Sequence, residues 1–470
     1  MSVEAMIVEA MLVAASQVIA VVVLLVVAAY TVRHLFFAQH RLFSSPRMDY
    51  TDLAGFHLPS VSVLIPMHNE AAVAEDILEA LAEADYPHDP DRLEVILVDD
   101  HSTDGTGAIL DEYAGRYPWI KVIHRRGGRR GKAAALSYGT REARGEILVM
   151  FDADYVPGKS LLKFLVAPFA DPEIGAVMGR VVPHNVGTSL LSRLLDLERA
   201  GGYQIGQQAR YSLGLIAQYG GTAGGVRRSA LEAAGGWDPH ALTEDTDLTL
   251  RLAIRGWKIA YVNRAECYEE VPETWESRRL QIERWAVGHT DCLHRHLGAL
   301  LRSPYLTRRE KWDGAFLLGV YLTAPLIALG WAATAILFFQ GSSYLPVWTP
   351  FFLASTCCNA LGNFASFFEI GSSVLLDGTG RRVRLLPLNV ANSLFSTATV
   401  TVALGKYYAS RVGGRRLGWS KTERHRNGNG NGNGNGNGNG PANGNGGSYA
   451  NGRGLNHIKA RAAAQGSGGE

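Results

Sequence analysis

Runs without a charged side chain constrain this chain most, because a backbone placed in lipid must satisfy its own hydrogen bonds and therefore forms a helix. Roughly 20 apolar residues are needed for such a helix to cross a bilayer. Four runs are long enough, and they cover residues 11–30, 315–339, 350–368 and 385–405. We therefore expect a soluble block at residues 51–290, with membrane helices on both sides of it.

The first run, with the basic segment that follows it, occupies residues 1–50 and has the features of a retained membrane-spanning helix. A cleaved signal peptide is the alternative, but the run is longer than such a peptide needs, and Glu4 and Glu9 precede it in place of basic residues. Positive charge collects on the cytoplasmic side of a span, which places the N-terminus outside and the soluble block in the cytoplasm, at the cell membrane. The basic residues concerned are Arg33, His34, Arg41 and Arg47.

The three later runs predict a C-terminal membrane region at residues 313–410. A basic cluster at residues 381–384 precedes the last run, so the two runs before it form an out-and-back hairpin. The last run is the most polar of the four and is also followed by basic residues, so a re-entrant or interfacial segment competes with a further crossing. Its polar residues are Asn389, Asn392, Ser393, Ser396, Thr397, Thr399 and Thr401.

Residues 291–312 join the soluble block to this membrane region and begin with an amphipathic pattern. The pattern predicts a helix lying in the membrane interface, with an ordinary surface helix as the alternative. Its apolar residues are Leu293, Leu297, Leu300 and Leu301, and they lie opposite His294, Arg295 and His296.

Composition excludes several classes of function. The formal net charge is +2, and no block of Lys and Arg alternates with aromatic residues, so nucleic acid is not expected as a partner. The cysteines lack the spacing of zinc ligands or of a disulfide framework, and we expect reduced thiols at Cys267, Cys292, Cys357 and Cys358. Residues 411–470 are first basic and then rich in Asn-Gly repeats, which predicts a disordered tail because no apolar strands flank the repeats.

Within the soluble block, short β-rich runs alternate with helical patterns. This alternation predicts an α/β fold with a mixed, mainly parallel sheet and helices on both faces. The β-rich runs are residues 61–68, 93–100, 121–125 and 146–154. Ligands bind such sheets beyond the carboxyl ends of the strands. Two pairs of carboxylates lie at such ends, Asp99 with Asp100 and Asp152 with Asp154, and we expect them to meet in one crevice.

Asp152 and Asp154 form an Asp-x-Asp pair directly after the fourth β-rich run. Hard cations prefer carboxylate oxygens together with phosphate oxygens and water, so this pair is suited to hold Mg²⁺ or Mn²⁺ on a diphosphate. Such a metal neutralises the charge that develops on a departing nucleoside diphosphate. A capped turn explains the same two residues when they are considered alone.

A second acidic cluster, Glu244, Asp245 and Asp247, precedes the helical pattern at residues 248–255. Neighbouring carboxylates repel one another and raise at least one pKa, which suits a general base, and Asp245 is our candidate. The alternative is that these carboxylates only stabilise the N-terminus of a helix.

Gln281, Arg284 and Trp285 have the i, i+3, i+4 spacing that places three side chains on one face of a helix. An arginine fork can grip two phosphate oxygens, and an indole offers a flat surface to a sugar ring. An amphipathic helix with a buried Trp is the alternative. Lys132 opens a further helix after residues 125–131 and could reach phosphate. Glu70 follows the first β-rich run and is a candidate to face the same crevice; the alternative is that this segment only forms a strand-to-helix cap at Asn69.

Together these motifs resemble the membrane-integrated glycosyltransferases of family 2, the group of the cellulose, chitin, hyaluronan and poly-N-acetylglucosamine synthases. The resemblance rests on the order of VDD at residues 98–100, DAD at 152–154, TED at 243–245 and QIERW at 281–285. It covers approximately residues 60–296. It implies a GT-A domain, which is Rossmann-like, with flanking transmembrane helices, a UDP-sugar donor and Mg²⁺ or Mn²⁺ as cofactor.

By this resemblance, Asp154 coordinates the metal with Asp152, and Asp245 removes the proton from the acceptor hydroxyl. The residues that would bind the nucleotide sugar are Asp99, Asp100, Glu70, Lys132, Asp152 and Arg284. Those that would bind the acceptor are Glu244, Gln281 and Trp285. Residues 220–228, GGTAGGVRR, replace the aromatic-rich acceptor motif of cellulose synthases, which argues against cellulose as the product.

The reaction that the resemblance implies is an inverting transfer that yields a β-glycoside. We expect a processive synthase that extends a β-linked polysaccharide from UDP-N-acetylglucosamine or UDP-glucose, with accessory export subunits among its partners. One alternative is a transferase that adds a single sugar to a membrane lipid. Another is a non-catalytic membrane subunit that binds nucleotide or glycan.

Overall fold

The computed structural model describes residues 3–44, 50–56, 58–339 and 365–413. Within these residues, eight strands form one sheet. The strands are β1 (Val61–Met67), β2 (Leu93–Asp100), β3 (Ile120–Arg125), β4 (Ile147–Met150), β5 (Val156–Pro157), β6 (Ile174–Pro183), β7 (Gly224–Arg227) and β8 (Lys258–Glu269).

The strand order in the sheet is β3-β2-β1-β4-β7-β6-β8-β5. The β1 strand pairs in parallel with β2 and β4, β2 with β3, and β6 with β8. The β7 strand runs antiparallel between β4 and β6, and β5 is antiparallel to β8. The predicted α/β fold with a mixed, mainly parallel sheet is therefore confirmed.

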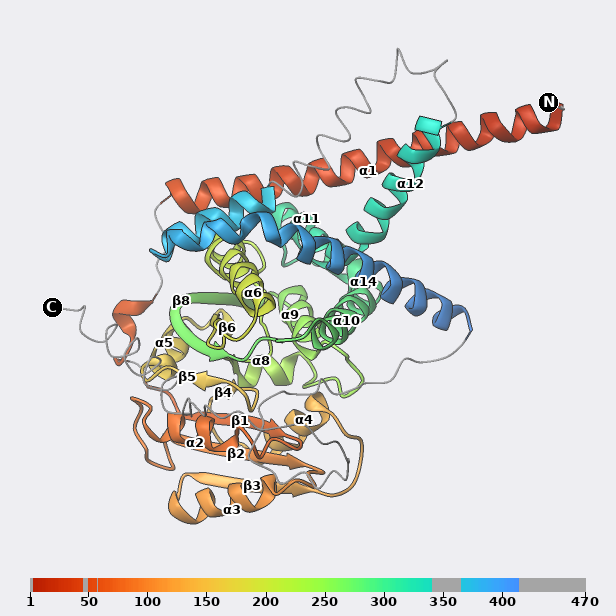
Figure 1. The fold of residues 1–470 in the computed structure, drawn as a ribbon. Coiled ribbons are helices and arrows are strands. Elements are labelled where there is room, and N and C mark those ends of the chain that lie inside the picture. Colours follow the sequence, from red (N-terminus) through yellow and green to blue (C-terminus); the bar gives the residue numbers. More distant parts are fainter. Residues whose placement is uncertain (1–2, 45–49, 57, 340–364, 414–470) are drawn as a thin grey trace, which may run out of the picture.

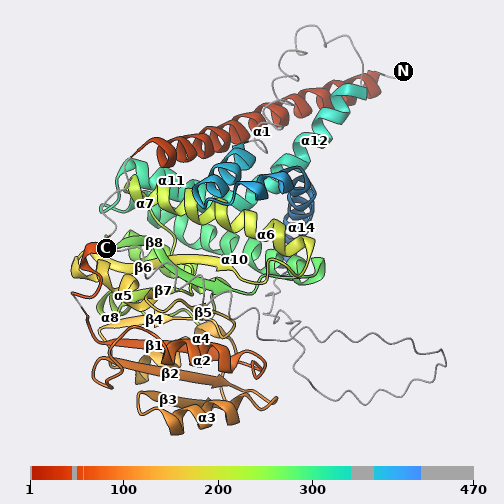
Figure 2. The ribbon, with the colours of Figure 1, turned by 60° about the vertical axis from the view of Figure 1, so that its left-hand side comes forward.

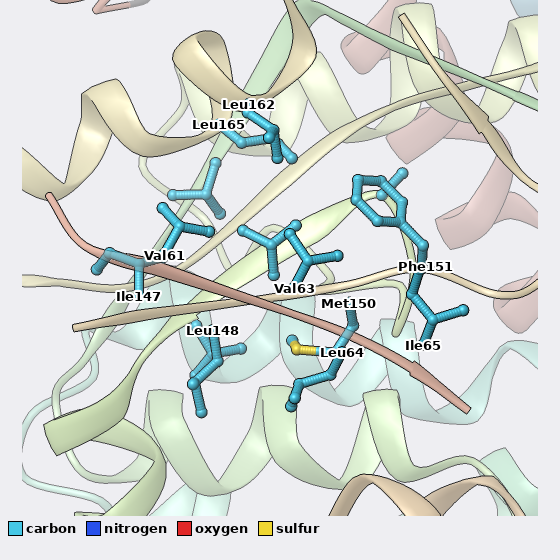
Figure 3. Packing of buried hydrophobic residues seen from close by; sticks show 14 of the residues in the cluster. Val61, Val63, Leu64, Ile65, Ile147, Leu148, Met150, Phe151, Leu162 and Leu165 are labelled. Carbon is cyan, nitrogen blue, oxygen red and sulfur yellow. The ribbon is translucent and has the colours of Figure 1, made fainter. Parts of the chain in front are cut away.

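The central strands β1 and β4 supply the middle of the hydrophobic core. Val63 and Leu64 of β1 and Leu148 of β4 are fully buried, although consecutive side chains of a strand point to opposite faces. This is the pattern of a sheet covered on both faces. On one face these strands pack beneath Leu162 and Leu165 of α5 (Leu161–Val166), as Figure 3 shows.

Helices cover the sheet on both faces and separate it from the N-terminal helix. Helices α6 and α10 lie between the sheet and the N-terminal helix (Figures 1 and 2). The helices of the domain, besides α5, are α2 (Ala74–Ala82), α3 (Thr106–Arg116), α4 (Lys132–Glu142), α6 (Leu190–Ala200), α7 (Gln208–Ser212), α8 (Arg228–Ala233), α9 (Glu244–Ile254) and α10 (Trp275–Arg302), with the π-helix η3 (Gly201–Gln207) and the 3₁₀ helices η1 (Thr51–Leu53) and η2 (Ala167–Ala170).

Among the described residues, three helices are long and apolar enough to cross a membrane. They are Met6–Phe43, Arg308–Phe339 and Gly380–Val412. The elements that form them are α1 (Val3–Phe43), α11 (Arg308–Gly319), η4 (Val320–Leu322), α12 (Thr323–Phe339), η5 (Gly380–Leu385) and α14 (Leu386–Val412). Helix α12 packs along α1 (Figure 1). Most of the predicted run at 350–368 and the tail after residue 413 lie outside the described residues.

The predicted segment at residues 291–312 divides between two helices. Its first part is the second half of α10, which begins at Trp275, and its last part belongs to α11. Leu293 and Leu300 are buried against Leu250 of α9, whereas Leu301 is 45% exposed. The apolar face of this amphipathic stretch therefore packs largely on the soluble domain.

Helix α14 contains the polar run at residues 385–405 except Leu385, and it turns its polar side toward the soluble domain. Asn389, Asn392 and Thr399 are buried. The Asn392 side-chain amide donates a hydrogen bond to Glu198 of α6 at 3.2 Å. The soluble domain thus provides a hydrogen-bond partner for a polar side chain of this run.

Candidate active site

A cavity of about 630 Å³ lies beyond the carboxyl ends of β1, β2 and β4, where the fold predicts a ligand site. Every site residue predicted from the sequence lines it except Asp99. Those that line it are Glu70, Asp100, Lys132, Asp152, Asp154, Glu244, Asp245, Gln281, Arg284 and Trp285. Residues up to 215 positions apart in the sequence, Glu70 and Trp285, therefore face one space.

Asp100 ends β2 and points to the cavity. Its carboxylate accepts hydrogen bonds from the Arg125 guanidinium at 2.7 Å and from the Gly131 amide at 2.9 Å. Arg125 ends β3 and Gly131 directly precedes α4, so the carboxylate ties both ends of the loop between β3 and α4 to the end of β2. The Asp100 carboxylate also contacts the His101 ring at 2.8 Å, and the residue is only 4% exposed and lines the cavity.

Asp99 points to the opposite side of the sheet, because consecutive residues of a strand alternate. It is fully buried and accepts hydrogen bonds from the His124 ring at 2.8 Å and from the Ser102 amide at 3.1 Å. Burial raises the pKa of Asp99, but these hydrogen bonds outweigh burial and hold the pKa below its usual value. Its direct role is to anchor the chain that follows β2, which positions Asp100.

Glu70 reaches the cavity from the turn after β1. Its backbone amide donates to the Thr106 hydroxyl at 2.9 Å, and the residue is 7% exposed. Asn69 does not cap α2, whose N-cap residue is Val73. Instead, the Asn69 side chain accepts a hydrogen bond from the Thr103 amide at 2.8 Å while its backbone adopts a positive φ of 54°. Asn69 therefore joins this turn to the segment after β2.

Lys132 lies at the first turn of α4, and its ammonium group bridges two carboxylates of the cavity. The Nζ atom lies 2.7 Å from Asp152 Oδ1 and 3.2 Å from Glu244 Oε1. Burial lowers the pKa of Lys132, but the two carboxylates outweigh burial and raise it above its usual value. Lys132 is therefore a permanent cation between the Asp-x-Asp pair and the acidic cluster of α9.

Asp152 and Asp154 follow β4 and are both half-buried in the cavity wall. Within the described residues, no group of three or more His, Cys, Asp or Glu side chains is placed to hold a metal ion. Mg²⁺ usually takes only one or two carboxylates and completes its shell with phosphate oxygens and water. The pair therefore fits a cation shared with a diphosphate and does not form a metal site of protein ligands alone.

The acidic cluster divides between two sides of α9. Glu244 and Asp245 line the cavity, and burial raises the pKa of each of them. Nearby cations, Lys132 for both and Arg284 for Asp245, partly offset that effect. The predicted upward pKa shift is therefore present, with burial as its largest cause and not repulsion between carboxylates.

Asp247 faces away from the cavity and is 1% exposed. It accepts hydrogen bonds from Arg251 and from His296, each at 2.7 Å. Burial raises the pKa of Asp247, but these bonds outweigh burial and lower it. The carboxylate fixes α9 against the second half of α10.

Gln281, Arg284 and Trp285 face the cavity from α10, as their spacing predicts. The Arg284 guanidinium makes no hydrogen bond or ion pair with another described residue, so its donors are available to a ligand. Trp285 is in contact with two cations: the guanidinium carbons of Arg199 and Arg278 lie 5.2 and 5.7 Å from its ring centroid. These contacts fix the orientation of the indole.

Several cavity residues lie outside the motifs. Arg199 of α6 and Tyr155 after β4 both donate to Glu269 at the end of β8, at 2.5 and 2.9 Å. The Glu269–Glu270 pair at a strand end is a signal in the sequence that could have identified this part of the cavity. No local pattern marks the remaining ones, because helices supply them from distant parts of the chain. They include Glu198, Tyr203, Arg210, His289 and, from α1, Arg33 and His34.

Gly221 explains part of the glycine-rich segment at residues 220–228. Its φ is 73°, and a Cβ atom added there would lie 3.0 Å from Asp245 Cβ and 3.2 Å from Glu244 Oε1. Glycine is required both by the backbone and by the close approach of α9. Gly221 thus allows the candidate base to lie close to the segment that precedes β7.

A family described as glycosyltransferase like family 2 matches residues 59–288, which contain the whole sheet and every predicted site residue. Residues 59–288 belong to glycosyltransferase family 2. The resemblance inferred from the ordered motifs is confirmed, and so is the prediction that the chain is an enzyme of this family.

Curated relatives of this family 2 glycosyltransferase include proteins with two kinds of product in their names. A probable glycosyltransferase of Bacillus subtilis is 39% identical over 49% of this chain and 56% of its own length. A beta-monoglucosyldiacylglycerol synthase of Synechocystis is 38% identical over 49% of this chain and 48% of its own. Glucomannan 4-beta-mannosyltransferase 7 of Arabidopsis thaliana is 29% identical over 73% of this chain and 63% of its own. The chain thus spans between 48% and 63% of the length of these relatives.

Among solved structures, the glycosyltransferase is similar to a mannosyltransferase of Pyrobaculum calidifontis in complex with GDP-mannose and Mn²⁺. The TM-score is 0.55 at 24% identity, and the match covers 76% of this chain and 98% of that chain. This likeness shows that the sheet domain has the predicted GT-A fold.

Proposed function

We propose that this chain transfers a sugar from a UDP-sugar to a hydroxyl group of an acceptor at the membrane, with inversion at the anomeric carbon. The observation that carries the proposal is the cavity itself. A carboxylate with a raised pKa, the Asp-x-Asp pair and the cations Lys132 and Arg284 all face one space. Asp100 at the end of β2 would bind the uracil, and Trp285 would contact the acceptor.

The proposed reaction is a single displacement. The acceptor hydroxyl gives its proton to Asp245 while its oxygen forms a bond to the anomeric carbon of the donor. The bond between that carbon and the diphosphate breaks, and UDP leaves with the electron pair. Lys132 and Arg284 would hold the diphosphate, because charge-assisted hydrogen bonds stabilise the negative charge that develops there.

Asp152 and Asp154 would hold a divalent cation, which when bound neutralises charge on the departing diphosphate. The Pyrobaculum mannosyltransferase binds Mn²⁺ together with its nucleotide sugar, which supports a metal of this kind. We expect excess EDTA to abolish UDP release from a UDP-sugar, and added Mg²⁺ or Mn²⁺ to restore it. Full activity after EDTA treatment and removal of free metal would contradict the metal assignment.

Arg284→Ala tests the diphosphate site with little effect on folding, because Arg284 has no hydrogen-bond partner among the described residues. Loss of one charge-assisted contact should weaken UDP binding by roughly 10- to 100-fold, measured by calorimetry. Arg279→Ala is the matched control, since Arg279 lies on the same helix and pairs with Glu276 and Glu283. Equal UDP affinity in both variants would remove Arg284 from the site.

Two acceptor classes follow from the relatives. A growing β-linked polysaccharide is favoured by the glucomannan mannosyltransferase, whose match covers 73% of this chain and so extends beyond the sheet domain. A membrane lipid is favoured by the beta-monoglucosyldiacylglycerol synthase, which is 38% identical. In both cases the three long apolar helices would hold the reaction at the membrane. The catalytic domain would lie in the cytoplasm, as the basic residues after the first apolar run predict.

The test is product analysis with the purified full-length chain in lipid nanodiscs and Mg²⁺ or Mn²⁺. Radiolabelled UDP-glucose and UDP-N-acetylglucosamine are supplied separately, and the products are resolved by size and by solubility in organic solvent. A long ladder supports a polysaccharide synthase, and one lipid-soluble product supports lipid glycosylation. Absence of UDP release and of product with every donor would contradict the proposed transfer.

A further inference from the structure

The cavity extends well past the sequence motifs. On the side of α1 it is lined by Arg33 and His34 of α1, Arg210 of α7 and Phe316 of α11. Helices α7 and α11 lie close to α1 and away from the strands β1 to β3 (Figure 2). This part of the cavity, which we call the outer end, therefore lies where two candidate membrane helices meet the soluble domain.

Arg210 has an unusual environment at the outer end. Its side chain is 14% exposed, yet its guanidinium makes no hydrogen bond with any described residue. The nearest carboxylate, Asp313 of α11, lies 3.6 Å from Arg210 Nε, which is too long for a hydrogen bond. A guanidinium carries five N–H donors, and leaving buried donors unsatisfied is costly.

The carboxylates near Arg210 are partly engaged by other side chains, although Asp313 Oδ2, 3.6 Å from Arg210 Nε, has no hydrogen-bond partner among the described residues. Asp313 Oδ1 accepts a hydrogen bond from Arg33 Nε at 2.7 Å. Glu369 is hydrogen bonded to the ring of His34. Burial and then repulsion from Arg33 lower the pKa of Arg210 to about 10, although Asp313 and Glu369 act in the opposite direction. Two guanidinium groups thus flank the one carboxylate of Asp313, and an added anion would supply Arg210 with the hydrogen-bond acceptor that it lacks.

We propose that Arg210, together with Arg33, binds the phosphate of an anionic phospholipid whose headgroup hydroxyl is the acceptor of the transferred sugar. The inference rests on the proposed transfer and selects the lipid between the two acceptor classes. A planar guanidinium fork matches the geometry of phosphate oxygens. In the proposed reaction the donor diphosphate lies elsewhere, because Lys132 and Arg284 would hold it near the strand ends.

The position of the outer end favours a lipid as the source of this phosphate. Arg33 belongs to Met6–Phe43 and Phe316 to Arg308–Phe339, and both helices are apolar enough to cross a membrane. A lipid headgroup lies at the bilayer surface, beside the ends of such helices. A phosphate bound at Arg210 would leave the rest of the headgroup free to extend along the cavity toward Asp245.

The experiment uses the full-length chain in nanodiscs of phosphatidylcholine, with or without phosphatidylglycerol. We expect transfer to be roughly tenfold or more faster when phosphatidylglycerol is present, with a glycosylated phosphatidylglycerol as product. Arg210→Gln should remove this advantage, and Arg210→Lys should retain part of it. Arg309→Gln is the control, because Arg309 is an exposed residue of α11. UDP affinity should be the same in wild type and in all three variants.

Two outcomes would overturn the inference. One is an equal preference for phosphatidylglycerol in Arg210→Gln and wild type at equal UDP affinity. The other is a polysaccharide product made equally well in phosphatidylcholine alone. Native mass spectrometry keeps the inference separate from the proposed reaction, because it counts phosphatidylglycerol retained by the protein without any turnover. If no transfer is seen, the lipid site is still supported when wild type retains phosphatidylglycerol and Arg210→Gln does not. The inference is overturned when Arg210→Gln retains as much phosphatidylglycerol as wild type.

Discussion

Asp245→Asn is expected to lower the rate of sugar transfer by roughly 100- to 10,000-fold, the range that general-base catalysis contributes. The substitution is nearly isosteric, and Asp245 Oδ1 accepts a hydrogen bond from the Thr246 amide at 2.7 Å that an asparagine oxygen can also accept. UDP affinity should therefore change little. The rate is measured as UDP release at saturating donor, and binding by calorimetry. A variant that keeps more than about a tenth of the wild-type rate would require another base.

The pH profile provides an independent check on Asp245. Burial raises the pKa of this carboxyl, and a base works only when deprotonated, so kcat/KM should fall as the pH drops through a value above the ordinary aspartate pKa of about 3.9. Arg284 lowers the pKa of Asp245, so Arg284→Ala should move this acid limb to higher pH. A limb that stays in place in Arg284→Ala would mean that Asp245 is not the group observed.

The second large effect concerns stability. Asp247→Ala is expected to lower the free energy of unfolding by about 3–5 kcal/mol, because it leaves the buried Arg251 guanidinium without its carboxylate and the His296 ring without its hydrogen-bond partner. Arg251 Nη2 lies 2.6 Å from Asp247 and has a side chain 14% exposed, and His296 Nε2 lies 2.7 Å away. Thermal or denaturant unfolding in detergent measures the change. Glu173→Ala is the control. The Glu173 side chain is 62% exposed, so its ion pair with Lys258 should contribute less than about 1 kcal/mol.

The pH dependence of this effect follows from the lowered pKa of Asp247. A carboxyl whose pKa is lower in the folded state stabilises the fold at every pH above its unfolded pKa of about 3.9. That contribution is lost as the pH falls through the folded-state pKa. The difference between wild type and Asp247→Ala should therefore be complete at neutral pH and shrink only in strong acid. A difference that disappears near neutral pH would show that another group is responsible.

The sequence predicted the sheet domain closely because its elements depend on local pattern. The β-rich run at residues 93–100 coincides with β2, and the run at residues 61–68 contains the whole of β1. The motifs at residues 98–100 and 152–154 also marked the ends of two strands, and the motif at residues 281–285 marked the side of α10 that faces the cavity. Apolar periodicity and helix spacing act over a few residues, so a single sequence contains them in full.

The tertiary structure alone decided which polar residues face the cavity and which fix the fold. Asp99 and Asp100 are adjacent in sequence, yet only Asp100 lines the cavity, and of the acidic residues near α9 only Glu244 and Asp245 do. Arg33, Arg210 and Glu269 join the site from α1, α7 and β8, which no local pattern links. The physical reason is that burial and charge pairing depend on packing between distant segments. The sequence therefore determined the fold and the candidate chemistry, and the packing of helices against the sheet determined which side chains are available for that chemistry.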